Sequence, residues 1–110
     1  MTTTRLFTYG TLMRRGRLEA LTSARLPAPR PAVLEGYRKY DTGQGYPIIL
    51  PESGHRVEGL LWEVEEQTLG YIDHYEGVDE EPPFYFRRQV EVDAGGERTS
   101  AWVYVGNPDA

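Results

Sequence analysis

The chain has 110 residues, no cysteine and two histidines, and its 17 acidic against 12 basic side chains give a formal net charge of −5. This length suits a single domain over residues 1–110, the missing cysteines exclude disulfides and thiol nucleophiles, and two histidines argue against a protein metal site. No apolar run approaches the roughly 18 residues of a membrane span, and the start lacks a signal-peptide layout, so we expect a cytoplasmic protein without a membrane partner. The negative net charge disfavours a nucleic-acid partner.

Short apolar segments, separated by turns rich in glycine, proline and acidic residues, show the alternation typical of strands. Six such segments follow one another, at residues 6–9, 33–40, 48–50, 57–64, 84–92 and 100–105. In the last segment Ala101, Val103 and Val105 oppose Trp102 and Tyr104, so both faces carry bulk. A strand buried on both faces indicates either a closed barrel or a sheet covered by helices.

Between residues 65 and 75 the pattern changes to the three-residue spacing of a short helix, with Leu69 and Ile72 on its apolar face. Acidic residues lead its first turn, where they favour the helix dipole. Gly77, just past its end, suits a helix C-cap. A second short helix is predicted over residues 17–23.

Charge is unevenly distributed along the chain. Residues 1–30 carry six arginines and one acid, whereas residues 62–81 carry eight acids and no base. Most charge runs are solvated faces, which is the simplest interpretation of the acidic block. Arg14, Arg15 and Arg17 either attract a substrate carboxylate or only solvate a loop.

The first candidate site is the turn formed by Tyr9, Gly10, Thr11 and Leu12, directly after the first strand. A glycine there lets the backbone approach a ligand closely, so that successive main-chain N–H groups can point at an anion or an oxyanion. Taken alone, these four residues are better explained by an ordinary turn at a strand end.

The second candidate is Glu76, which stands where the predicted helix gives way to a loop, beside Tyr75 and among other acids. Like charges and burial both disfavour a carboxylate, and a carboxyl tuned towards neutral pH can accept and donate a proton. The alternative is a solvated loop acid. His74 has no serine or cysteine nucleophile paired with it and is assigned to surface or packing. Tyr85 and Arg87, two residues apart on one face, either contact a polar ligand or edge the sheet.

In six ordered segments the chain resembles the γ-glutamylcyclotransferase-like family, especially its small branch of γ-glutamylamine cyclotransferases and AIG2-like proteins. The segments are LFTYGTLMRRG, LEGYRKYDTGQGYPIILP, VEGLLWEV, YIDHYEG, YFRRQVEV and AWVYV. The resemblance covers nearly the whole chain. It implies an α+β fold, a small mixed β-barrel of about six strands flanked by short helices. We expect a monomer or homodimer.

The resemblance also implies roles for matching residues. The family's glycine loop, which binds the γ-glutamyl moiety through main-chain groups, falls on Tyr9 to Leu12, and its catalytic glutamate falls on Glu76. A tyrosine that is often near the substrate falls on Tyr85. The chain departs from the family in two places: it lacks the Asn and His that often follow the arginine-rich stretch, and its acidic insert Asp79 to Pro83 is longer than usual.

The activity that this resemblance implies needs no metal or cofactor. The α-amine of a γ-glutamyl amide attacks its own γ-carbonyl, releasing 5-oxoproline and a free amine, with Glu76 as general acid and base. Two alternatives share the scaffold: a non-catalytic module that binds a small ligand, and an amide hydrolase that would release glutamate. A nucleic-acid role resting on the basic first 30 residues ranks lowest.

Overall fold

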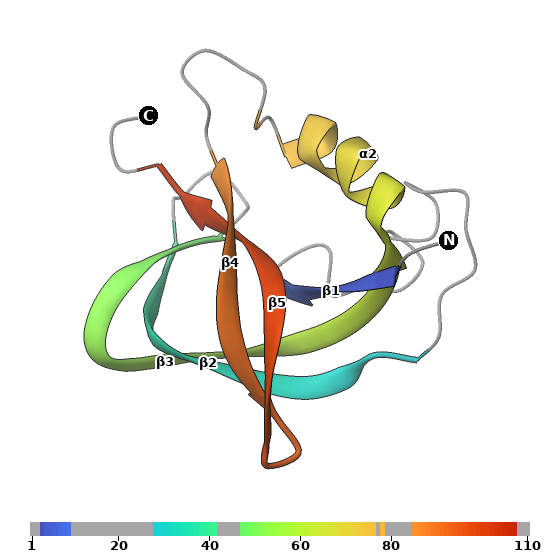
Figure 1. Cartoon of the computed structure of the whole chain (residues 1–110). Coiled ribbons are helices and arrows are strands. Elements are labelled where there is room, and N and C mark those ends of the chain that lie inside the picture. The colour runs from blue at the N-terminus through green and yellow to red at the C-terminus, as the bar shows by residue number, and fades with distance from the viewer. Residues whose placement is uncertain (1–2, 10–27, 42–46, 77, 79–84, 108–110) are drawn as a thin grey trace.

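The computed structural model describes residues 3–9, 28–41, 47–76, 78 and 85–107, without the side chains of residues 75 and 76. Five strands and one helix lie in this part of the chain (Figure 1). They are β1 (Thr3–Thr8), β2 (Arg30–Asp41), β3 (Pro47–Glu65), α2 (Glu66–Glu76), β4 (Tyr85–Ala94) and β5 (Glu97–Gly106). Across these ranges, no helix has both the length and the apolar character needed to span a membrane.

The strands pair in the order β1-β3-β2-β4-β5, and β5 returns to β1, which closes the sheet. All pairs are antiparallel except β1 with β5, which meet in parallel where Leu6 faces Trp102. The expected α+β class, dominated by strands in mixed pairing, is therefore confirmed.

The number of strands differs from the expected six. The two strands predicted at 48–50 and 57–64 belong to one strand, β3, which bends strongly in Figure 1. Glu35 of β2 pairs with Arg56 and Tyr37 pairs with Pro51, so Gly36 alone stands opposite residues 52–55. The polar sequence around Gly54 has the composition of a turn, but β3 continues through this bulge as one strand. Gly36 and Gly54 allow the bend, since their φ angles are +84° and +85°.

Apolar side chains pack on both faces of the closed sheet, as the alternation in β5 predicts. One cluster draws on all five strands and includes Ala101, Val103 and Val105, which places it inside the closure. The second cluster lies on the outer face, beneath α2, and its buried members are Leu6, Trp62, Val64, Leu69, Ile72, Tyr85 and Tyr104. A doubly buried strand was expected in either a closed barrel or a sheet covered by helices. Both features occur here, because the sheet closes and α2 covers part of its outer face.

The predicted helix is present as α2, shifted by one residue from the expected range. It buries Leu69 and Ile72 against the outer face of the sheet. At its end the N–H of Val78 donates to the carbonyl of Asp73 at 3.0 Å, the six-to-one bond typical of a Schellman helix end. Gly77, the predicted cap, and the helix predicted over residues 17–23 lie outside the described residues.

Candidate active site

The structure describes only part of the candidate site. Tyr9 and Tyr85 are buried, with 6% and 8% of their surface exposed. Glu76 is the last residue of α2, but its side chain lies outside the described part, as do Gly10, Thr11 and Leu12. The described residues that adjoin the site are those that hold the ends of β1 and α2.

The end of β1 is fixed on both faces of the sheet. Trp62 donates from its indole Nε1 to Thr8 Oγ1 at 2.9 Å, and both side chains are buried. The next side chain, Tyr9, donates its hydroxyl to the backbone carbonyl of Tyr104. Because buried hydrogen bonds are costly to break, these two contacts hold the backbone immediately before Gly10.

The last turn of α2 is held by Asp73. Its Oδ1 accepts from the Tyr104 hydroxyl at 2.7 Å and lies 2.8 Å from Nε of Arg87. The Arg87 guanidinium also lies over the Trp102 ring, 4.5 Å from its centroid. Of the two interpretations of Arg87, the structural one agrees with this ion pair, although the closed sheet leaves β4 without a free edge.

Tyr104 connects these two ends. Its carbonyl accepts from Tyr9 at the end of β1, and its hydroxyl donates to Asp73 in α2. Tyr85, at the start of β4, donates its hydroxyl to the carbonyl of Pro47 at 2.8 Å and so links β4 to the start of β3. Tyr9, which precedes Gly10, and Asp73, in the helical turn that ends at Glu76, therefore both contact Tyr104 of β5.

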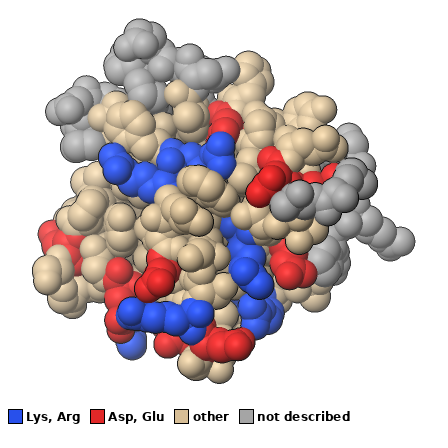
Figure 2. Space-filling view, in the orientation of Figure 1, with Lys and Arg blue, Asp and Glu red and all other residues tan. Residues whose placement is uncertain are grey.

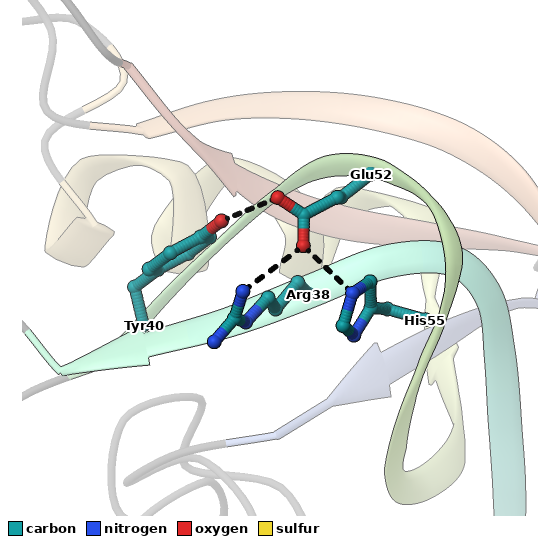
Figure 3. A network of polar contacts seen from close by, with 4 residues as sticks. All are labelled: Arg38, Tyr40, Glu52 and His55. Carbon is teal, nitrogen blue, oxygen red and sulfur yellow. Dashed lines mark hydrogen bonds and ion pairs between the residues drawn. The ribbon is translucent and has the colours of Figure 1, made fainter.

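A second polar cluster, which the sequence analysis did not identify, lies at the bulge between β2 and β3 (Figure 3). Glu52 is its centre: it accepts from Tyr40 at 2.8 Å and lies 3.3 Å from Arg38 and 3.0 Å from Nε2 of His55. The hydrogen bond from Tyr40 is the main cause that lowers the pKa of Glu52, and the same bond raises the pKa of Tyr40. The ionised Glu52 carboxylate thus links β3 to Arg38 and Tyr40 of β2 beside the bulge.

Replacing Tyr40 by phenylalanine should raise the pKa of Glu52 towards its ordinary value, because the largest stabilisation of the carboxylate is lost. The same contact stabilises the fold above the unfolded-state pKa of Glu52, and this contribution disappears as the pH falls through the lowered folded-state value. A carboxyl NMR titration measures the shift. Tyr37→Phe, on the same strand, is the matched control and should leave Glu52 unchanged; equal effects of the two variants would contradict this assignment.

Charge on the described surface is mixed. Figure 2 shows basic and acidic side chains interspersed on the face in view. Of the six arginines within residues 1–30, Arg5 and Arg30 lie in the described part, and Arg14, Arg15, Arg17 and Arg25 do not. Within the described ranges, no three His, Asp or Glu side chains are grouped as a metal site requires.

Comparisons with known proteins point to one family. A family model described as gamma-glutamyl cyclotransferase, AIG2-like, matches residues 6–110. The γ-glutamylaminecyclotransferase A of Danio rerio is 28% identical over 116 residues, covering 90% of this chain and 66% of that protein. The γ-glutamylaminecyclotransferase of Rattus norvegicus is 36% identical over 61 residues, covering 56% of this chain and 36% of that protein. The matched part of this chain therefore covers about two thirds of the first relative and about a third of the second.

Solved structures share the fold. An AIG2-like protein from Mus musculus is similar with a TM-score of 0.80 at 26% identity, covering 99% of this chain and 82% of that one. A protein from Arabidopsis thaliana, solved in solution, gives a TM-score of 0.84 at 23% identity, covering 100% of this chain and 72% of that one. At such identity the second likeness concerns the fold alone.

Proposed function

This chain belongs to the gamma-glutamyl cyclotransferase, AIG2-like family, and from that premise we propose that it cyclises a γ-glutamyl amine to 5-oxoproline and a free amine. The observation that carries the proposal is the family match over residues 6–110, which includes both the Tyr9 to Leu12 turn and Glu76. The names of the Danio rerio and Rattus norvegicus relatives support an amine as leaving group.

The reaction uses a nucleophile that the substrate itself carries. The α-amino nitrogen attacks the γ-carbonyl carbon, forming the new C–N bond of a five-membered lactam and a tetrahedral oxyanion. Collapse of the oxyanion then breaks the original amide C–N bond and expels the amine. The protein must hold the chain curled, stabilise the oxyanion and move protons, and positioning alone supplies about 7–11 kcal/mol in well-oriented intramolecular reactions.

In this proposal Glu76 performs both proton transfers. As a carboxylate it removes a proton from the attacking nitrogen, and as a carboxylic acid it returns that proton to the leaving nitrogen. A positioned group of this kind contributes roughly 10²–10⁴-fold in rate. One residue suffices because the two transfers occur in sequence and return it to its starting state.

We assign the binding of the γ-glutamyl group to the turn Tyr9 to Leu12, whose main-chain N–H groups would serve the oxyanion or the substrate carboxylate. The anchoring of Thr8 and Tyr9 supports this assignment, because a preorganised loop needs a fixed starting point. Tyr85, buried at the start of β4, would line the same site.

The test is an assay of the products formed from a series of γ-glutamyl alkylamines and γ-glutamyl amino acids. We expect 5-oxoproline and free amine from at least one alkylamine substrate. The N-acetylated form of that substrate, whose nitrogen can no longer attack, should yield no product. Release of glutamate, with oxygen taken from labelled water, would indicate hydrolysis instead, and thermal stabilisation of the protein without any product would indicate a binding module.

A further inference from the structure

A series of polar contacts links the residue directly after β1 to three elements of the fold, β5, α2 and β4. It runs from Tyr9 at the end of β1 to Tyr104 of β5, on to Asp73 of α2, and ends at Arg87 of β4. The chain begins at the residue before Gly10 and passes through the helical turn that ends at Glu76. It therefore connects the two segments to which the proposed chemistry is assigned.

The contacts at Asp73 fix a single atom from two directions. Oδ1 receives the hydroxyl of Tyr104 at 2.7 Å and Nε of Arg87 at 2.8 Å, and these donors belong to different strands. The contact with Tyr104 is a hydrogen bond to a charged group, which is shorter and stronger than a neutral one, and the contact with Arg87 is an ion pair. Arg87 is itself restrained, because its guanidinium rests on the Trp102 ring.

Apolar burial also attaches α2 to the sheet, beside the polar contacts at Asp73. Leu69 and Ile72 are 4% and 0% exposed within the outer cluster, and their burial supplies the apolar contact that holds the helix. A helix held only by apolar contact can still rotate or slide slightly, since such contacts are not directional. The bonds at Asp73, in contrast, specify the orientation of the last turn.

We propose that Asp73 is a positioning residue, which acts through Tyr104 and Arg87 to set the last turn of α2, and with it the catalytic Glu76, relative to the turn Tyr9 to Leu12. This inference rests on the proposed function of Glu76. Its physical basis is that a displacement of about 1 Å between reacting groups can lower a rate by roughly 10²-fold. The competing interpretation is an ion pair at the protein surface that contributes little to stability and nothing to the reaction.

Three variants separate positioning from simple stabilisation. Tyr104→Phe removes only the hydroxyl and keeps the ring and the carbonyl that accepts from Tyr9. Asp73→Asn keeps an oxygen acceptor for Tyr104, whereas Asp73→Ala removes it. The matched control is Arg98→Lys in β5, because Arg98 makes an exposed ion pair with Glu91 at 3.6 Å that lies outside the chain of contacts.

We expect kcat on a γ-glutamyl amine to fall about 10- to 100-fold in Tyr104→Phe and Asp73→Ala, with KM changed less than about threefold. Asp73→Asn should recover part of the loss, and Arg98→Lys should match the wild type. At a temperature where every variant is fully folded, the amide NMR signal of Val78 should shift in Tyr104→Phe and that of Tyr9 should stay, because the variant loses only the contact with Asp73. Wild-type kcat in Tyr104→Phe and Asp73→Ala would overturn the positioning role alone, while a wild-type protein without turnover would overturn the proposed function and this inference together.

Discussion

Glu76→Gln should reduce the release of 5-oxoproline by at least about 10²-fold, because the glutamine side chain can neither take up nor return a proton at the reacting nitrogens. The variant should fold as well as the wild type. Glu76 is the last residue of α2, where the helix carries partial negative charge, so removing a carboxylate from this end does not weaken the helix. Turnover measured beside thermal unfolding gives both quantities from one preparation.

The matched control lies at the other end of the same helix. Glu66 is exposed in the first turn of α2, where an acid is favourable to the dipole. Glu66→Gln makes the same chemical change, and it should leave turnover intact while making the protein slightly less stable. A Glu76→Gln protein that turns over its best substrate at the wild-type rate would show that the proton transfers belong to another group.

Gly59→Ala should destabilise the protein by about 1–3 kcal/mol, the usual range for overpacking a tight site. A Cβ at this position would lie 2.2 Å from the carbonyl oxygen of Thr8 and 2.8 Å from Cζ of Phe7. The oxygen belongs to the backbone and cannot rotate away, so the end of β1 must move. Because that end leads into the proposed binding turn, kcat/KM should fall as well.

Gly70→Ala is the control for this second change. Gly70 lies in α2, and a Cβ there would meet nothing within 4 Å. Replacing a helical glycine by alanine stabilises by about 0.5–1 kcal/mol, so the two substitutions should shift the denaturation midpoint in opposite directions. A Gly59→Ala protein with wild-type stability and turnover would mean that β1 tolerates displacement at the site.

Local patterns in the sequence were sufficient to predict much of the fold. The alternation in β5 predicted two packed faces, and the spacing of Leu69 and Ile72 predicted α2. The number of strands was wrong because the polar residues around Gly54 have the composition of a turn. Whether such residues form a turn or a bulge depends on the pairing of β3 with β2, which the local sequence does not encode.

The polar contacts of the site could not be predicted in the same way. Tyr9 and Tyr104 are 95 residues apart in sequence, and Asp73 and Tyr104 are 31 apart. Their meeting depends on the closure of the sheet and on the placement of α2, so no spacing within one segment reveals it. Tyr104 was interpreted as packing bulk, which it is, but the tip of its ring also carries a hydroxyl that reaches the helix.

The most direct test of the proposed site is a crystal structure of the protein with 5-oxoproline bound. We predict that its carboxylate or lactam oxygen accepts hydrogen bonds from main-chain N–H groups of Gly10 to Leu12, with the Glu76 carboxyl within hydrogen-bond reach of the lactam nitrogen. Product bound elsewhere, for example at the cluster around Glu52 at the β2–β3 bulge, or an empty site at saturating 5-oxoproline, would contradict the assignment.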